Sequence, residues 1–368
     1  MHDFIVIGGG LIGMLTAREL RLADARVAVL ERGHTGKEAS WAGGGILSPL
    51  YPWRYPDAVT ALASWSQSRY ADFCNALVAE SGIDPEWTQS GLLMLGEQDN
   101  KAAMAWARKK DKKLEVVANQ VLPKLEPGLS SIFTSALLLP DIAQVRNPRL
   151  LRALEASIKS MGVTVEENIG VQDITVEAGH VTGVRTTCGQ RSAGNVVIAG
   201  GAWSGMLAKS FGVSLDVEPV RGQMILFRGR PGLVSHIILH DGRYLIPRRD
   251  GRVLAGSTLE YVGYDKATTD DARRDLYDFA VSLIPDLAAC EIENHWAGLR
   301  PGSPQSIPYI GVVPGTKGVF VNAGHFRNGV TTGPASARLL SDIALSRQPI
   351  LSPAPYSLKA HESSIKAG

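Results

Sequence analysis

Three glycines near the N-terminus are spaced in a way that could bind a phosphate group. They form the pattern Gly8-x-Gly10-x-x-Gly13, which follows the apolar run 4–7 and precedes a helical pattern of apolar residues. In such a turn the first glycine permits a tight bend, the second lets the backbone approach a pyrophosphate, and the third lets helix and strand pack closely. The helix N-terminus adds free N–H donors and a partial positive charge. The pattern therefore predicts a dinucleotide site.

A carboxylate at Glu31 supports this interpretation. It ends a second apolar run, 26–31, at the place where an acidic side chain hydrogen-bonds the ribose hydroxyls of a dinucleotide. A carboxylate there would repel a 2′-phosphate, which disfavours a phosphorylated ribose. A second glycine-rich stretch, 38–49, follows in place of the next strand–helix–strand step of a nicotinamide domain. From these residues alone, FAD, NAD and other dinucleotides all remain open.

Three residues farther along the chain could act on a small charged molecule. Arg300 has no acidic residue close by in sequence, and a guanidinium can bind a carboxylate through two parallel hydrogen bonds, although a solvated loop arginine is the alternative. Tyr244 alternates with Ile246 along a strand-like run, so its hydroxyl could bind the same carboxylate or its ring could pack across strands. His325 follows Gly324 in a glycine-rich turn, where a contact with the cofactor is favoured over proton abstraction.

The elements that must position these residues fall into two groups. In the first group, short apolar runs end at glycine clusters, as neighbouring strands of a parallel sheet would do at its carboxyl edge; they are residues 4–7, 195–199 and 318–323. In the second group, strand-like runs alternate with Asp-Gly turns, which indicates tight antiparallel hairpins; they are residues 222–227, 236–239, 243–248 and 252–258. Helices are expected at 61–81, 270–283 and 332–346.

The composition excludes several classes of protein. The chain has 368 residues, of which 45% are hydrophobic and 20% charged, and its formal net charge of +2 is too small to indicate nucleic acid as a partner. No apolar run reaches the ~18–20 residues of a membrane-spanning helix, and no secretory leader is recognisable. Three widely spaced cysteines, Cys74, Cys188 and Cys290, predict buried or half-buried thiols in a reducing cytoplasm, with neither disulfides nor a metal site.

Several longer motifs identify a family. The chain resembles the FAD-dependent D-amino-acid oxidase superfamily, and within it the glycine oxidases of bacterial thiamine biosynthesis, over residues 5–343. The resemblance rests on the glycine turn, on Glu31 and on six further segments, residues 40–47, 196–205, 244–248, 295–302, 308–311 and 323–329. The last three segments are the most specific for the oxidases.

The resemblance implies most of the site residues. Together with the glycine turn, the expected FAD-binding residues are Gly8, Gly10, Leu11, Ile12, Gly13, Glu31, Arg32, Ala39, Ser40, Gly44, Gly45, Ile46, Val171, Gly200, His325, Phe326, Arg327, Asn328, Gly329, Val330 and Thr331. By the same resemblance Arg300 pairs with the substrate carboxylate, Tyr244 contacts the substrate, and Arg327 forms the pocket wall. Leu259 stands where glycine oxidases have a methionine, which leaves the depth of the pocket open.

The implied activity is oxidative deamination of glycine and other small amines, such as sarcosine and small D-amino acids. Hydride would pass to flavin N5, and the products would be glyoxylate or another 2-oxo acid, ammonia and hydrogen peroxide, as a supply of thiazole precursor. The FAD is expected to be non-covalent, because no cysteine lies in residues 300–305, beside which sarcosine oxidases of the superfamily tether their flavin. A dehydrogenase that uses a quinone or carrier protein, and a non-catalytic dinucleotide-binding protein, remain alternatives.

These observations together predict an α/β fold with two interleaved domains. A Rossmann-like FAD-binding domain would comprise residues 1–80, 146–215 and 303–368, and an antiparallel-sheet α+β substrate domain would comprise residues 81–145 and 216–302. The expected partners are a small amino acid and O2, with no nucleic acid and no membrane. The family also suggests a homotetramer, although nothing in the residues demands one.

Overall fold

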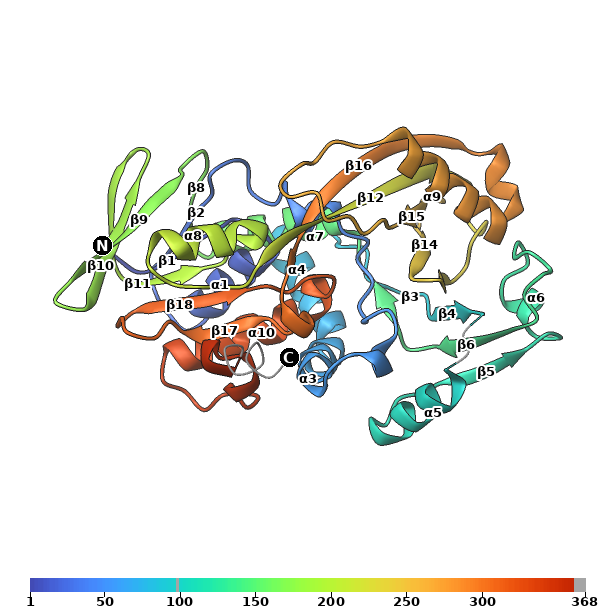
Figure 1. Cartoon of the computed structure of the whole chain (residues 1–368), viewed down its shortest axis with the longest axis horizontal. Coiled ribbons are helices and arrows are strands. Elements are labelled where there is room, and N and C mark those ends of the chain that lie inside the picture. Colours follow the sequence, from blue (N-terminus) through green and yellow to red (C-terminus); the bar gives the residue numbers. More distant parts are fainter. Residues whose placement is uncertain (97–98, 361–368) are drawn as a thin grey trace.

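The computed structural model describes residues 1–96 and 99–360, and most of its strands belong to two large sheets (Figure 1). The first sheet has the strand order β17-β18-β11-β1-β2-β8, with a β9–β10 hairpin extending β11. Its strands are β1 (His2–Ile7), β2 (Val27–Leu30), β8 (Thr164–Glu166), β9 (Val171–Glu177), β10 (His180–Thr186), β11 (Gly189–Ile198), β17 (Tyr309–Val312) and β18 (Val319–Ala323). Strands β18, β11, β1, β2 and β8 are parallel neighbours. The predicted parallel sheet from distant parts of the chain is confirmed.

The central strands are apolar and buried over residues 4–7, 27–30 and 196–198, because both faces of the sheet are covered there. On one face Val6 and Val29 pack with five helices, α1 (Leu11–Arg21), α3 (Asp57–Gln67), α4 (Tyr70–Ser81), α7 (Asn147–Ser160) and α10 (Gly329–Ala344). On the other face Ile5 and Leu30 pack with the β9–β10 hairpin and α8 (Ser204–Ser210). Each fully buried Val, Leu or Ile contributes about 1.5–3 kcal/mol, so this layered core fixes the edge where the glycine turns lie.

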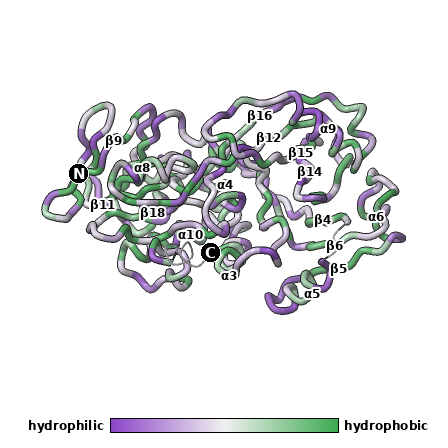
Figure 2. The backbone as a smooth tube through the Cα atoms, viewed as in Figure 1, coloured by the Kyte–Doolittle hydropathy of each residue, from purple (hydrophilic) through white to green (hydrophobic). Residues whose placement is uncertain are grey.

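The second sheet has the order β16-β12-β15-β14-β13-β4-β6-β5. Its strands are β4 (Leu92–Leu95), β5 (Glu115–Ala118), β6 (Ser135–Leu139), β12 (Glu218–Arg228), β13 (Ile237–His240), β14 (Arg243–Pro247), β15 (Val253–Gly256) and β16 (Glu291–Gly302). All pairs are antiparallel except β13 with β4. Helix α9 (Asp270–Leu283) packs on one face of this sheet. Strands β4 and β6 are themselves hydrophobic (Figure 2). Both predicted Asp-Gly hairpins are confirmed.

Shorter elements lie between and beside the strands of the two sheets. They are the helices α2 (Ala39–Ala42), α5 (Asn100–Lys109) and α6 (Leu122–Leu125), the strand pair β3 (Thr88–Gln89) and β7 (Ala143–Gln144), and the 3₁₀ turns η1 (Pro52–Arg54), η2 (Gly201–Trp203), η3 (Pro285–Ala289), η4 (Pro304–Ser306) and η5 (Ala354–Tyr356). No helix in the described part of the chain is long and apolar enough to cross a membrane. The domain bounds given above stay a prediction.

Three details differ from the sequence-based expectations. The helical stretch 61–81 is two helices, α3 and α4, because the backbone leaves the helical path at Ser68 and Arg69. The last helix begins at Gly329, three residues earlier than the expected position 332, so its N-terminus lies at the carboxyl edge of the first sheet. Cys188 is exposed rather than buried, because it lies in the turn between β10 and β11.

Candidate active site

A cavity of about 440 Å³ lies where the carboxyl edge of the first sheet meets strands β12, β14 and β16 of the second. Most of the predicted site residues line this cavity. They are Gly8, Gly10, Leu11, Ile12, Glu31, Arg32, Ala39, Ser40, Gly44, Gly45, Ile46, Val171, Gly200, Tyr244, Arg300, His325, Phe326, Arg327, Gly329 and Val330. The chain therefore brings nucleotide-type and substrate-type residues to one cavity.

The glycine turn shows why two of its positions exclude a side chain. Gly8 has φ +114°, and a Cβ on it would lie 2.4 Å from the carbonyl oxygen of Ala199 on the neighbouring strand end. A Cβ on Gly13 would lie 1.9 Å from the Gly8 carbonyl oxygen, so this glycine sets the close packing of α1 on β1. Leu11 and Ile12 line the cavity from the first turn of α1, where helix N–H groups have no intrahelical acceptor. This turn fits a pyrophosphate.

The Glu31 carboxylate is fixed at the end of β2 before any ligand binds. It accepts hydrogen bonds from the backbone N–H groups of Gly9 at 2.8 Å and Gly33 at 2.9 Å. A carboxylate has about four acceptor positions, so two such bonds leave capacity for the hydroxyls of a ribose. Nearby, the Arg32 guanidinium lies 3.7 Å from the ring centroid of Trp203, and both residues line the same end of the cavity.

The glycine loop 43–46 is held by Arg248, which the sequence-based analysis did not assign to the site, and by Thr331, which it expected at the cofactor. Arg248 is half-buried and donates to the carbonyl oxygens of Gly44 at 2.7 Å and Val145 at 3.0 Å, and to Gln144 Oε1 at 2.7 Å. Burial and the neighbouring charge of Arg146 lower the pKa of Arg248 to about 10, so it remains a cation at neutral pH. Thr331 Oγ1 donates to the Ile46 carbonyl oxygen from α10, at 3.0 Å.

Arg300 lies on β16, on a strand rather than in the loop that was its alternative. Its guanidinium donates to Ser257 Oγ at 2.6 Å, to the Thr258 carbonyl oxygen at 3.2 Å and to the Arg221 carbonyl oxygen at 3.3 Å. All three acceptors are uncharged, and Arg300 forms no ion pair with a carboxylate of the described residues. Burial lowers the pKa of Arg300; the charge of Arg327 reinforces this effect, whereas Tyr244 and the charge of the nearby Glu260, which does not contact Arg300 directly, oppose it. A ligand carboxylate would supply the missing counter-charge.

Tyr244 and Arg327 both lie near enough to this guanidinium to interact with it electrostatically. Tyr244 is 7% exposed on β14, and its ring and hydroxyl lie against the position that a Cβ on Gly44 would take. Arg327 follows β18 and donates to the Gly242 carbonyl oxygen at 3.1 Å. The substrate-type residues thus come from β14, β16 and the turn before α10, which are far apart in sequence.

His325 is buried, and both of its ring nitrogens have side-chain partners. Nε2 lies 2.9 Å from Asn322 Oδ1, and Nδ1 lies 3.1 Å from Thr332 Oγ1. Burial lowers the pKa of His325 to about 3, so the ring is neutral at physiological pH. This arrangement fits the expected packing role of His325 beside the cofactor better than that of a base.

A few residues lie differently from expectation. Gly13, Asn328 and Thr331 are outside the cavity lining, and Leu259 is 47% exposed and does not line the cavity either. The cavity is lined instead by residues that the sequence-based analysis did not single out, among them Ser48, Leu50, Gly222, Met224 and Gly298. Glycines that interrupt a strand mark close approaches, and this was the one available signal for Gly222 and Gly298.

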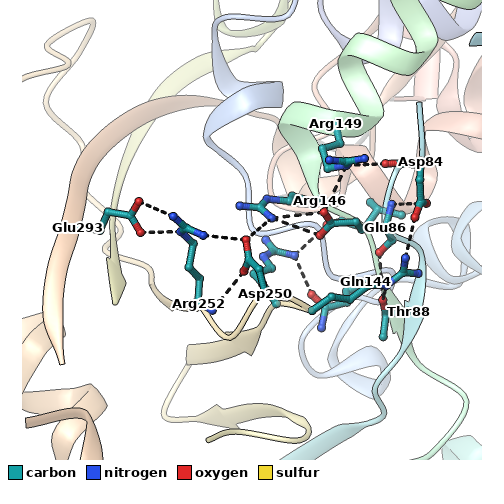
Figure 3. Close-up of polar contacts among 12 residues, drawn as sticks. Asp84, Glu86, Thr88, Gln144, Arg146, Arg149, Asp250, Arg252 and Glu293 are labelled. Carbon is teal, nitrogen blue, oxygen red and sulfur yellow. Dashed lines mark hydrogen bonds and ion pairs between the residues drawn. The ribbon is translucent and has the colours of Figure 1, made fainter. Parts of the chain in front are cut away.

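A second set of arginines lies outside the cavity, where the two sheets meet (Figure 3). Arg252 binds both carboxylate oxygens of Glu293, at 2.6 and 2.7 Å, and also contacts Asp250. Arg146 continues the chain of contacts from Asp250, at 2.8 Å, to Glu86. These ion pairs join β15, β16 and α7 close to Arg248.

The parallel sheet, the glycine turn and the ribose-type carboxylate define a dinucleotide-binding oxidoreductase. The family model described as FAD dependent oxidoreductase matches residues 3–343, so the chain belongs to that family. Its relatives include glycine oxidases of Pseudomonas aeruginosa, 49% identical over 96% of this chain and 97% of that protein, and of Pseudomonas putida, 47% identical over the same shares. The crystal structure of glycine oxidase from Geobacillus kaustophilus superposes with a TM-score of 0.91 at 29% identity, covering 97% of this chain and 98% of that one.

The comparisons confirm the resemblance to glycine oxidases, the fold class and the assignment as an FAD-dependent enzyme. The cavity fits this cofactor, because the glycine turn, the first turn of α1 and the Glu31 carboxylate present the groups that a pyrophosphate and a ribose require. The individual residues assigned to FAD and to substrate remain predictions supported by their place in the cavity.

Proposed function

We propose that this chain oxidises glycine, and with it other small amines such as sarcosine and small D-amino acids. The products are glyoxylate or another 2-oxo acid, ammonia (methylamine in the case of sarcosine) and hydrogen peroxide, with O2 as the electron acceptor. The observation that carries the proposal is the Arg300 guanidinium, which lines the cavity and has only uncharged partners among the described residues. The names of the Pseudomonas relatives support glycine as the first substrate.

The side chains of the cavity act mainly by binding and orientation. Arg300 binds the carboxylate, which fixes the direction of the Cα–H bond, and Tyr244 packs beside it. FAD, when bound, supplies the two-electron acceptor, so the protein needs no acid–base pair for the bond that is oxidised. Arg327 adds positive charge, and the neutral His325 holds the turn before α10 through Asn322 and Thr332.

The cofactor is proposed to bind without a covalent bond, because none of the cavity-lining residues is a cysteine. Acid precipitation of the purified protein should then release the yellow flavin into the supernatant. Colour that stays with the precipitated protein would contradict this part of the proposal.

The proposal extends to the cellular role. A relative in Synechocystis is a bifunctional ThiO/ThiG protein, 31% identical over 94% of this chain, and the chain corresponds to 52% of its length. This supports a role in supplying the thiazole precursor of thiamine. We further propose that the chain acts in the cytoplasm as a homo-oligomer. Light scattering of the purified protein tests the oligomeric state.

The test is the reaction itself. Purified protein loaded with FAD should lose its visible flavin band on anaerobic addition of glycine, and in air it should form glyoxylate, ammonia and hydrogen peroxide in equal amounts. Bleaching without peroxide in air would favour the dehydrogenase alternative, which uses a quinone or carrier protein. No bleaching with glycine, sarcosine or D-alanine would favour a non-catalytic dinucleotide-binding protein.

A further inference from the structure

Arg300 lies directly over a glycine on the neighbouring strand. Strands β12 and β16 pair so that Val220 faces Arg300 and Gly222 faces Gly298. A Cβ on Gly222 would lie 2.1–2.3 Å from three atoms of the Arg300 guanidinium. Any other residue at position 222 would therefore occupy the space that the guanidinium fills.

Two of the three hydrogen-bond acceptors of Arg300 come from one short segment, residues 257–260, which follows β15. Ser257 Oγ and the Thr258 carbonyl oxygen both accept from the guanidinium. The third acceptor, the Arg221 carbonyl oxygen, also accepts from the Glu260 N–H group at 3.0 Å, and the Arg221 N–H group donates to the Glu260 carbonyl oxygen at 2.9 Å. The segment is thus paired with β12 at its far end.

The Glu260 side chain also holds this segment in place, through hydrogen bonds to β12 and within the segment itself. Its carboxylate accepts from Arg221 Nε at 3.0 Å, from Gln223 Nε2 at 2.9 Å and from the hydroxyl of Thr258. Arg221 is 5% exposed. Burial opposes ionisation of Glu260, but the hydrogen bonds from Thr258, Arg221 and Gln223 outweigh it, so its pKa lies below the ordinary value.

We propose that Glu260 and Gly222 are positioning residues for the amino-acid carboxylate, and that both act through Arg300. Glu260 holds the segment whose oxygens orient the guanidinium, and Gly222 leaves the space in which it lies. The inference rests on the proposed function for the identity of the substrate, but not for the binding of a carboxylate.

The chain contains a matched control for Glu260. Glu293 is also a glutamate of the second sheet that is paired with an arginine, Arg252, and both carboxylate side chains are 24% exposed. Glu293 does not line the cavity and has no contact with Arg300 or its acceptors among the described contacts. Glu260→Gln and Glu293→Gln therefore remove the same charge from two equally exposed glutamates, one paired with the buried Arg221 beside Arg300 and one paired with the more exposed Arg252 away from it.

The experiment is a calorimetric titration of the FAD-loaded protein with acetate, which has a carboxylate but no amine to oxidise. Glu260→Gln should weaken acetate binding about tenfold and raise the KM for glycine by a similar factor with a smaller change in kcat, whereas Glu293→Gln should change each less than about twofold. Equal weakening in both variants, or in neither, would overturn the role of Glu260. If acetate binds as expected and glycine is not oxidised, the proposed function fails and the positioning role stands.

Gly222 is tested by the same titration. Gly222→Ala should weaken acetate binding more than Glu260→Gln does, because the new methyl displaces the guanidinium itself. Gly194→Ala is the control, since a Cβ there meets only the Asp3 carbonyl oxygen at 3.8 Å. Thermal unfolding shows which variants fold, and a folded Gly222→Ala protein with unchanged acetate affinity would overturn the role of Gly222.

Discussion

The cavity and the junction of the two sheets both contain several arginines, but the arginines have different partners. At the junction, Arg252 and Arg146 each bind carboxylates of this chain, Glu293, Asp250 and Glu86 among them (Figure 3). In the cavity, Arg300 binds only uncharged oxygens among the described residues. A buried cation without an internal counter-ion is costly unless a ligand neutralises it. The difference separates arginines that join elements from an arginine that binds a ligand.

Arg248 shows that the lack of a carboxylate partner alone does not make an arginine a ligand-binding residue. It too has only uncharged acceptors, but these are the backbone of the glycine loop and Gln144, and Arg248 does not line the cavity. Access to the cavity and the lack of a carboxylate partner are therefore needed together. The following predictions test this distinction, in order of decreasing effect.

Removing the cavity guanidinium should have the largest effect. Arg300→Met keeps the apolar volume but loses the charge–carboxylate interaction, which corresponds to roughly 2–4 kcal/mol, so kcat/KM for glycine should fall roughly 30- to 900-fold. Steady-state peroxide release at varied glycine concentration measures this, and FAD affinity serves as the control. A change of less than threefold would remove Arg300 from substrate binding.

Removing the half-buried Arg248 should act on stability and on the cofactor instead. Arg248→Met leaves the carbonyl oxygens of Gly44 and Val145 without their donor, which should cost roughly 3 kcal/mol of unfolding free energy and loosen the loop 43–46. FAD affinity should fall about tenfold, with a smaller change in the KM for glycine. Denaturant unfolding and titration of the apoprotein with FAD measure the two effects. A change in the KM for glycine larger than the change in FAD affinity would contradict the distinction between Arg248 and Arg300.

The buried His325 should make stability fall in acid. Its pKa is about 3 in the folded chain against 6.5 ordinarily, so below pH 6.5 the unfolded state binds a proton that the folded state does not. Stability is then complete above pH 6.5 and is lost as the pH falls toward 3, by at most about 1.4 kcal/mol per pH unit. Unfolding of the wild type and of His325→Gln at several pH values checks this. Parallel pH profiles of the two proteins would contradict it.

Removing a paired arginine at the junction should have the smallest effect. Arg252→Met breaks the contacts with Glu293 and Asp250, but these groups are partly exposed and water can replace the arginine, so the loss of unfolding free energy should be about 1 kcal/mol or less. The KM for glycine should change less than about twofold. An effect on KM comparable to that of Arg300→Met would show that the junction arginines also serve the substrate.

Much of the nucleotide side of the molecule could be predicted from the sequence, because its signals are local. The glycine turn, Glu31 and the apolar strands β1, β11 and β18 each lie within short segments whose spacing has a direct physical meaning. The resemblance to known oxidases supplied Tyr244, Arg300 and Arg327. The surroundings of these residues could not be predicted in the same way. The position of the Arg300 guanidinium depends on the pairing of β12 with β16 and on a segment near residue 260. Local sequence patterns do not determine such long-range strand register.

The measurement that tests the account most directly compares glycine with methylamine, which has the amine but no carboxylate, in the wild type and in Arg300→Met. If Arg300 binds the carboxylate, the kcat/KM of the wild type should be roughly 100-fold or more higher for glycine than for methylamine. In the variant, kcat/KM for glycine should fall and that for methylamine should stay nearly the same, so that most of the preference is lost. A variant that keeps the full preference, or that loses activity equally toward both amines, would contradict the account.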